Sequence, residues 1–370
     1  MDVRRLCGAL VERAAQSPGM NVLVTGGTGF LGQEIVRMLR ADGVEVHVLA
    51  RATSKQAALA GLGVQWQAGD LCDPDSIDRA VAAGVESARG RGAALRVVHC
   101  AALISYRTGD RARARAINVE GTRTLLDSAG RRGCGRLVFV SSVVAVGHSL
   151  RGEVLDESAP FNSAPLRVDY VDTKRAAEEL VLARAREIDV VVVNPGAIFG
   201  PVDRVSNTVR FIREIAVGRP PPFAPPGSIS VVGVHDAARG TLRALDRGRR
   251  GERYLLVESH LGLRDLLSEM ASLVGARPVK RTLPRGAWRA LTFAAGAWDS
   301  VFAMRATPPQ ALRMLGVDLR FDAAKARREL DWDPRPLREV LLETVQHMRE
   351  RGLLPPVARP HDEGRSLTRA

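Results

Sequence analysis

From residue 21 onward, short runs of β-branched and apolar residues alternate with longer stretches in which Ala, Leu and Arg recur at helical spacing. The apolar runs predict strands over residues 21–25, 44–49, 64–68, 97–100, 137–141 and 190–194. The stretches between them predict helices over residues 33–41, 75–83, 111–129 and 172–186. Strands that alternate with helices of this length form right-handed βαβ units. We therefore expect an α/β fold built on a doubly wound parallel sheet that is covered by helices on both faces.

After Gly200 the pattern changes to a Pro-rich stretch at residues 219–227, a strand at 230–234, and then mostly helical segments with Pro and Gly between them. We expect residues 20–200 to form the larger domain and residues 201–354 to form mostly a smaller, helical C-terminal lobe, with 228–257 returning to the larger core. Residues 1–19 form an N-terminal extension, and either Met20 is the native start or the extension packs on the surface. The polar stretch 355–370 is expected to be a loose tail.

A glycine-rich loop joins the first predicted strand to the first predicted helix. Glycines allow a tight turn and let backbone N–H groups approach a pyrophosphate, while the helix N-terminus stabilises the anion. The position of the loop at the head of an alternating pattern indicates a nicotinamide-dinucleotide site, so residues 20–200 are predicted to be a Rossmann domain. The loop residues assigned to this site are Gly26, Thr28, Gly29, Phe30, Leu31 and Gly32.

The residue that ends the second strand decides which dinucleotide is bound. An acid at this place bonds the ribose 2′-hydroxyl of NAD, but this chain has Arg51, with Ser54 and Lys55 close by. A planar cation with neighbouring donors suits a 2′-phosphate. NADP(H) is therefore favoured, and NAD(H) is the alternative if Arg51 is an ordinary surface arginine. Two dipeptides are expected to complete the site, Asp70 with Leu71 beside the adenine and Ala101 with Ala102 beside the ribose and nicotinamide.

Tyr170 and Lys174 are four residues apart and so lie on one face of a predicted helix. An ammonium near a phenol favours the ionised phenol and lowers a pKa that is otherwise near 10. Tyr170 can then give a proton to a carbonyl oxygen as hydride reaches the carbon, or take one from an alcohol in the reverse direction. The pair predicts acid–base chemistry beside the dinucleotide, and a merely packed helix tyrosine is the alternative.

Together these motifs resemble those of the extended short-chain dehydrogenase/reductase family. The match rests on the loop at 25–32, on YxxxK at 170–174, on Ser141-Ser142 and on segments 118–122, 194–201 and 321–334, and it covers Met20 to about Arg349. The resemblance implies that Ser142 and Asn118 belong to the catalytic set with Tyr170 and Lys174, and that two chains pair through helices 111–129 and 172–186. A strand end for the serines and a packing role for Asn118 are the alternatives. The resemblance also implies cofactor contacts from Ser141, Tyr170, Lys174, Pro195, Gly196 and Ile198.

The resemblance leaves three reactions, which are ketone reduction, epimerisation of nucleotide sugars and dehydration. Dehydratases of this family carry an acidic pair after the serine or threonine, where this chain has Val143-Val144. Its epimerases usually carry an Arg before the VxD motif, where this chain has the uncharged residues 227–231. The remaining resemblance is to the dihydroflavonol-reductase and 3β-hydroxysteroid-dehydrogenase branches, whose substrates are apolar ketones or alcohols.

We therefore expect an NADP-dependent oxidoreductase that interconverts a ketone and a secondary alcohol on a hydrophobic steroid-, flavonoid- or 3-oxoacyl-like substrate. A nucleotide-sugar epimerase with tightly bound NAD is the second hypothesis. A dinucleotide-sensing regulator without turnover is the third, and the intact Ser142, Tyr170 and Lys174 argue against it. Residues 287–304 predict a largely apolar helix that walls the substrate pocket, rests on a membrane surface or packs in the lobe.

The net charge of +13 raises the question of an anionic partner. Only four of the 54 basic residues are lysines, and Arg is spread along the whole chain, so we expect no nucleic-acid partner. The four cysteines lack paired spacing, which predicts neither a metal site nor a disulfide framework. Without a signal peptide or a spanning apolar run, the expected location is the cytoplasm, and peripheral membrane contact through 287–304 stays open. Of two further polar residues, His99 is interpreted as a satisfied strand residue and Asp236 as the N-cap of a helix over 237–245.

Overall fold

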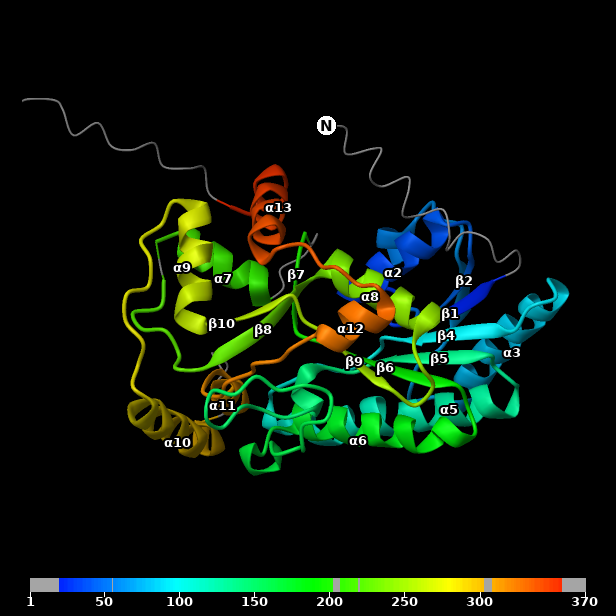
Figure 1. Ribbon diagram of the computed structural model, residues 1–370, viewed down its shortest axis with the longest axis horizontal. Helices are drawn as coiled ribbons and strands as arrows, with labels where there is room; N and C mark the ends of the chain where they lie inside the picture. Colours follow the sequence, from blue (N-terminus) through cyan, green and yellow to red (C-terminus); the bar gives the residue numbers. More distant parts are fainter. Residues whose placement is uncertain (1–19, 55, 202–206, 219, 303–307, 355–370) are drawn as a thin grey trace, which may run out of the picture.

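The structure is a computed structural model that describes residues 20–54, 56–201, 207–218, 220–302 and 308–354 (Figure 1). Its central feature is a seven-stranded sheet with the strand order β3-β2-β1-β4-β5-β6-β9. All neighbouring strands run parallel, and the order reverses between β1 and β4, as in a doubly wound sheet. The strands are β1 (Asn21–Thr25), β2 (Glu45–Ala50), β3 (Gln65–Ala68), β4 (Leu95–His99), β5 (Arg136–Val140), β6 (Val190–Pro195) and β9 (Arg253–Leu256).

Side chains of each strand alternate between the two faces of this sheet, because successive strand residues point in opposite directions. In β1, Val22 and Val24 belong to the core on one face and Leu23 to the core on the other. Figure 1 shows the helical layers that cover the two faces. The predicted doubly wound α/β fold is therefore confirmed. The first layer contains α2 (Phe30–Ala41) and α8 (Val234–Arg247), and the second contains α3 (Pro74–Gly90), α5 (Gly121–Arg131) and α6 (Asp169–Ala183).

The six strands predicted within residues 21–194 are all present, and no end differs by more than two residues. The strand predicted at 230–234 runs from Ser228 to Gly233. The helix predicted over 111–129 is wrong in one respect, because it is not a continuous α-helix. It consists of α4 (Arg111–Arg115), a π-helical turn (Ala116–Glu120) and α5. The π turn contains Asn118, whose side chain is hydrogen-bonded to the loop that follows β4. Such turns recur at functional sites.

The lobe is built on a second, three-stranded sheet with the order β10-β8-β7. Its core lies between this sheet and three helices that pack on it. Within residues 228–257, which we expected to return to the larger core, β9 pairs with β6 of the main sheet and β8 belongs to the small sheet. The lobe elements are β7 (Ala197–Phe199), β8 (Ser228–Gly233), β10 (Ser259–Gly262), α7 (Asn207–Ala216), α9 (Leu263–Val274), α10 (Arg285–Phe302), α11 (Pro309–Leu315) and α13 (Leu337–Glu350). α12 (Ala324–Leu330) packs instead on α8 and β9 of the larger domain.

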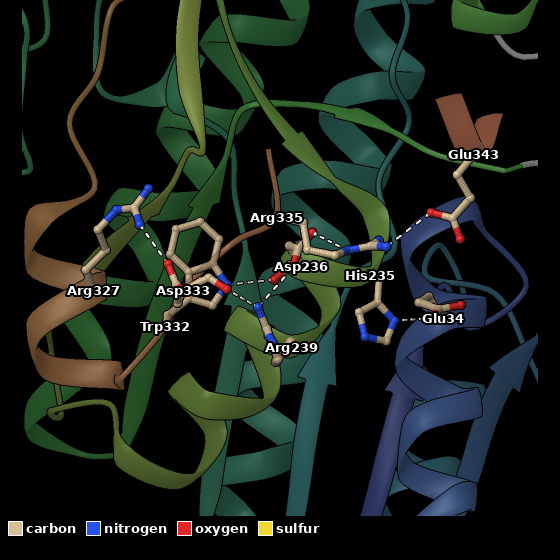
Figure 2. Close-up of polar contacts among 9 residues, drawn as sticks. All are labelled: Glu34, His235, Asp236, Arg239, Arg327, Trp332, Asp333, Arg335 and Glu343. Carbon is tan, nitrogen blue, oxygen red and sulfur yellow. Dashed lines mark hydrogen bonds and ion pairs between the residues drawn. The ribbon is translucent and has the colours of Figure 1, made fainter. Parts of the chain in front are cut away.

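A buried charge cluster around Asp236 fixes the segment after α12 to α8 (Figure 2). The prediction that Asp236 is an N-cap is wrong, because α8 begins at Val234 and Asp236 lies inside its first turn. The Asp236 carboxylate is completely buried and accepts hydrogen bonds from Arg239 at 3.0 Å and Arg335 at 3.4 Å. Its backbone carbonyl accepts one from Trp332 at 2.8 Å. Both carboxylate oxygens are therefore used to hold the C-terminal segment in place.

None of the helices in the described ranges combines the length and apolarity that crossing a membrane requires.

Candidate functional site

The glycine-rich loop between β1 and α2 has the geometry of an anion cradle. Gly26 has a φ of +71°, and a Cβ atom there would lie 2.6 Å from the backbone nitrogen of Ala101. A Cβ atom on Gly32 would collide with the Gly26 carbonyl. Gly29 caps α2 without any side-chain hydrogen bond, so the first N–H groups of the helix have no side-chain cap. The loop therefore requires glycine and can hold a pyrophosphate, which fits a dinucleotide.

A cleft of about 450 Å³ continues from this loop along the carboxyl ends of the main-sheet strands. Phe30 and Leu31 do not line it but begin α2, where Leu31 packs in the core. Lys55 lies outside the described residues. The lining includes nine of the nineteen residues assigned to the cofactor, namely Gly26, Thr28, Gly29, Arg51, Ser54, Asp70, Leu71, Ala101 and Ala102. It does not include Gly32, Ser141, Tyr170, Lys174, Pro195, Gly196 or Ile198.

Two arginines line the same cleft. Arg51 follows β2 directly, and its Nε atom lies 3.9 Å from Oδ2 of Asp70, with both side chains more than a third exposed. Arg113 comes from α4 and was not found from the sequence. The alternation of Arg111, Arg113 and Arg115 was the available signal, but nothing in it showed which arginine faces the cleft. The cleft therefore offers two cations to an anionic group.

Tyr170 lies buried in the first turn of α6. Burial raises the pKa of the Tyr170 phenol, the neighbouring Tyr106 raises it further, and a side-chain hydrogen bond with Ser142 lowers it. The phenol is consequently protonated at neutral pH. Tyr106, whose ring centre is 5.7 Å away in an edge-on arrangement, was missed from the sequence. Only its rarity, as one of three tyrosines, pointed to it.

Lys174 lies one helical turn after Tyr170 and is 3% exposed. Its ammonium donates to the Val140 carbonyl at 2.7 Å and sits 4.8 Å from the centre of the Phe139 ring. Burial lowers the pKa of Lys174 to about 8, and the Glu178 carboxylate opposes that shift. An ammonium has three N–H donors, and the described residues accept one hydrogen bond from it. Lys174 therefore keeps donor capacity for a ligand.

Glu178 is a buried carboxylate next to Lys174 in the helix, and it was not predicted from the sequence. It lies one turn after Lys174 with no exposed surface. Its carboxylate accepts a hydrogen bond from Asn194 Nδ2 at 2.6 Å and lies 3.3 Å from Arg253 on β9. Asn194 also donates to the Ser142 carbonyl at 3.0 Å. The network thus ties the backbone of Ser142 to the Glu178 carboxylate through Asn194, and the charge of that carboxylate supports the Lys174 ammonium.

Asn118 holds two segments together rather than facing open space. Its Oδ1 atom accepts from the Leu103 N–H at 2.7 Å, and its Nδ2 atom donates to the Leu103 carbonyl at 3.0 Å and to Thr173 at 3.1 Å. These bonds use both amide hydrogens. The contacts assign Asn118 the role of positioning the loop after β4 against α6.

The remaining predicted residues lie where β6 leaves the main sheet. Ser141 bonds the Val193 carbonyl through its backbone N–H, and its buried hydroxyl has no partner among the described residues. Pro195 is the last residue of β6, and a Cβ atom on Gly196 would lie 2.5 Å from the Ser230 carbonyl oxygen. Ile198 pairs with β8 in the small sheet. These residues therefore form the joint between domain and lobe.

His99 is satisfied on both sides of its ring, by Thr25 at 2.6 Å and Thr122 at 2.9 Å. Burial lowers the pKa of His99 to about 3, and the Lys174 charge acts in the same direction. The imidazole is therefore neutral at physiological pH and is a structural group. The residues that the structure describes contain no cluster of His, Cys, Asp and Glu that could hold a metal ion.

Comparison with known proteins gives a match over most of the larger domain. The model of the NAD dependent epimerase/dehydratase family matches residues 22–256. The chain is 36% identical over 342 residues to sterol demethylase protein B of Methylococcus capsulatus, covering 90% of this chain and 100% of that protein. It is 32% identical over 333 residues to a 4-hydroxy-2-methyl-3-oxo-4-farnesyl-3,4-dihydroquinoline-1-oxide ketoreductase of Stigmatella aurantiaca, covering 85% of this chain and 92% of that protein.

Solved structures agree with this match. The crystal structure of gox2253 superposes with a TM-score of 0.78 at 30% identity, covering 90% of this chain and 99% of that one.

Proposed function

Because this chain belongs to the NAD-dependent epimerase/dehydratase family and is an NAD(P)-dependent oxidoreductase of CH–OH and C=O groups, we propose that it interconverts a ketone and a secondary alcohol on a hydrophobic substrate. We further propose that NADP(H) is its cofactor. The observation that carries the proposal is a buried, protonated Tyr170 hydrogen-bonded with Ser142, one helical turn from Lys174. This pair is a proton donor that is fixed in direction before a substrate arrives.

The acid–base step follows from the state of the Tyr170 phenol. Bound nicotinamide would supply or accept the hydride. Tyr170 would donate its proton to the carbonyl oxygen, and the Ser142 hydroxyl would hydrogen-bond the same oxygen. Lys174, with a charge supported by Glu178, would stabilise the phenolate that remains until a proton returns. In the oxidative direction the same groups would take the proton from an alcohol.

The surroundings of Ser142 favour this reaction over dehydration. Elimination needs an acid and a base beside the sugar, whereas Val143 and Val144 form a buried turn directly after Ser142. The names of the two relatives also refer to a sterol and to a farnesylated ketone. Both are hydrophobic compounds, in keeping with the substrate class that we propose.

Arg51 and Arg113 support the choice of NADP(H). A 2′-phosphate adds negative charge at the end of β2, where an NAD-binding site carries an acid. Arg51 stands at this place and Arg113 lines the same cleft. Guanidinium groups bind phosphate in a planar, two-pronged geometry. The pairing of Arg51 with Asp70 is exposed and therefore weak, so a phosphate can displace it.

Fluorescence titration with NADPH and NADH tests the cofactor, and a panel of steroid, flavonoid and 3-oxoacyl ketones tests the substrate class. We expect wild-type protein to bind NADPH more tightly than NADH. Arg51→Glu should weaken NADPH binding by about tenfold or more and leave NADH binding nearly unchanged. Arg89→Glu, on the exposed surface of α3, is the control. Equal binding of both cofactors would contradict the NADP proposal, and copurified NAD with product formed without cofactor consumption would indicate epimerisation instead.

A further inference from the structure

The helix that carries Tyr170 and Lys174, α6, is not capped by the residue that precedes it. It begins at Asp169, and Val168 before it makes no side-chain capping hydrogen bond. The first N–H groups of an α-helix have no partner within the helix, and helix ends without such partners fray. Tyr170 is the second residue of the helix. The position of its phenol therefore depends on what holds the start of α6.

The cap comes from the lobe, 141 residues further along the chain. Gln310 in α11 accepts a hydrogen bond from the backbone N–H of Asp169 through Oε1 at 2.8 Å, and its Nε2 atom donates to Oδ2 of Asp169 at 2.8 Å. Gln310 is 5% exposed, and a hydrogen bond shielded from water is stronger than one at the surface. One side chain of the lobe thus satisfies the first N–H group of α6 and fixes the Asp169 carboxylate.

A second residue of α11 holds the segment that leads into α6. Arg313 donates through Nη1 to the carbonyls of Arg167 at 3.0 Å and Leu166 at 3.3 Å. Arg167 has a φ of +49°, in the left-handed region that a residue other than glycine rarely adopts. Such a conformation persists only where surrounding contacts stabilise it, and α11 supplies contacts of this kind.

α11 is itself fixed to the rest of the lobe. Trp288 of α10 is buried and donates through Nε1 to the Leu312 carbonyl at 3.0 Å. Arg285, also in α10, donates to the Gly316 carbonyl at 3.3 Å and forms an ion pair with Asp318, so it holds the chain directly after α11. The start of α6 is therefore attached through α11 to the body of the lobe.

The larger domain gives Asp169 a weaker partner. Arg111 of α4 has its Nε atom 3.6 Å from Oδ1 of Asp169, and its side chain is 79% exposed. An exposed ion pair of this kind contributes little. Among the side-chain contacts that the structure describes for Asp169, those with Gln310 are the shorter and the more buried.

We propose that Gln310 is a positioning residue of the reaction, which caps α6 from the lobe and thereby holds the Tyr170 phenol in the place from which it donates its proton. The proposal rests on the proposed function, because it takes Tyr170 as the proton donor. The lobe then aligns the acid of the larger domain. Loss of Gln310 slows the proton transfer more than it weakens cofactor binding, since the glycine cradle belongs to the loop after β1.

Fluorine NMR tests the positioning without any turnover. The chain has three tyrosines, so the full-length protein labelled with 3-fluorotyrosine should give three resonances, which Tyr106→Phe, Tyr170→Phe and Tyr254→Phe assign. Gln310→Ala should shift or broaden the Tyr170 resonance and leave that of Tyr254, on β9, unchanged. Gln346→Ala is the control, because Gln346 is an exposed glutamine of another lobe helix, α13, and it should change neither resonance. An unchanged Tyr170 resonance in Gln310→Ala, or an equal change in Gln346→Ala, would overturn the proposal.

Kinetics with NADPH and an apolar ketone that the protein reduces test the consequence for the reaction. Gln310→Ala should lower kcat per folded molecule by about tenfold or more, while KM for NADPH stays within about twofold. Gln346→Ala should change neither quantity. Full kcat in Gln310→Ala, or a loss confined to KM, would contradict a positioning role.

A rescue experiment separates the Gln310–Asp169 contact from general loss of stability. Gln310→Glu places a second carboxylate against that of Asp169 and should lower kcat at least as much as Gln310→Ala. Adding Asp169→Asn replaces the repulsion by a donor and an acceptor, and kcat should return to within about threefold of wild type. A double variant as slow as Gln310→Glu alone would overturn the proposal. If the wild-type protein reduces no ketone while Gln310→Ala still moves the Tyr170 resonance, the proposed function fails and the link from Gln310 to Tyr170 stands.

Discussion

Two buried charge clusters in this molecule use similar groups for different purposes. Around Asp236, two arginines and a tryptophan satisfy the carboxylate and its backbone carbonyl, and the cluster lies between α8 and the C-terminal segment (Figure 2). Around Lys174, one carboxylate supports an ammonium that makes a single hydrogen bond to the described residues. The second cluster contains Lys174 one helical turn from the protonated Tyr170 phenol, and the first cluster contains no such acid–base pair.

The comparison teaches that buried charge does not by itself identify an active site. Both carboxylate oxygens of Asp236 are bound by arginines and none of its surface is exposed, so its charge stabilises the fold. Lys174 keeps two N–H donors, and Tyr170 keeps its proton. N–H donors that the described residues leave unused are what separates the Lys174 cluster from the Asp236 cluster. Four substitutions can break or sharpen this contrast.

Tyr170→Phe is expected to have the largest effect. Removal of the proton donor should lower kcat by about 10² to 10⁴-fold, while NADPH binding and Tm stay nearly unchanged. Tyr254→Phe is the matched control, because its hydroxyl bonds Arg249 and Glu329 far from the cleft. It should cost about 1 kcal/mol of unfolding free energy and leave kcat intact. Full activity of Tyr170→Phe in steady-state assays would remove the phenol from the mechanism.

Asp236→Asn should lower stability and leave kcat unchanged, which is the opposite of the result expected for Tyr170→Phe. Two arginines lose their buried partner, so the free energy of unfolding should fall by about 3 kcal/mol or more. The folded fraction should keep its kcat. Denaturant unfolding measures the first quantity, and activity per folded molecule measures the second. Asp246→Asn, at an exposed position on the same helix, serves as control and should change stability little. Loss of turnover without loss of stability would show that the Asp236 cluster is not merely structural.

Glu178→Gln tests the support of Lys174 through the pH dependence of kcat. Activity should fall as the pH rises through about 8, because the Lys174 ammonium loses its proton there. Glu178 raises the pKa of Lys174, so its removal should move that fall to lower pH. Glu179→Gln, an exposed neighbour that pairs with Arg175, should leave the profile unchanged. If Glu178→Gln leaves the pH dependence of kcat unchanged, Glu178 does not support the Lys174 charge and has only a packing role.

Glu34→Gln should have the smallest effect. The Glu34 Oε1 atom lies 2.9 Å from His235 Nδ1, in an ion pair between α2 and α8 beside the Asp236 cluster (Figure 2). An exposed pair contributes about 0.5 kcal/mol, so Tm should hardly change and kcat should not change. Thermal unfolding scans of Glu34→Gln and of Asp236→Asn, run side by side, measure it. A loss as large as that of Asp236→Asn would mean that the structural cluster extends to the surface.

The elements of the fold could be predicted because their signals are local. The β-branched runs predicted the strand ends to within two residues. The glycines that close backbone contacts require predicted the loop after β1. The Asp236 prediction failed because α8 begins two residues earlier, at Val234, and the role of the Asp236 carboxylate was missed because its partner Arg335 is 99 residues away in the sequence. A local N-cap pattern cannot reveal such a partner.

The site was predictable where one helix or loop carries it, as for Tyr170 and Lys174. The assignment of Ser142, Asn118 and the cofactor residues to their chemical roles stays a prediction. Tyr106, Arg113 and Arg253 could not be found, since only the folded chain brings them to the site. Glu178 follows Lys174 at helical spacing, but its burial depends on β6 and β9 packing against α6.

The central claim is that this chain transfers hydride from NADPH to a ketone carbon while Tyr170 supplies the proton. The most direct measurement uses NADPH deuterated at the transferable position, an apolar ketone that the protein turns over, and mass spectrometry of the product. The account predicts an alcohol with one deuterium on the carbinol carbon, formed in equal amount to the NADP produced, and at least about 100-fold slower formation of it by Tyr170→Phe. An isomerised product without deuterium and without net cofactor consumption would contradict it.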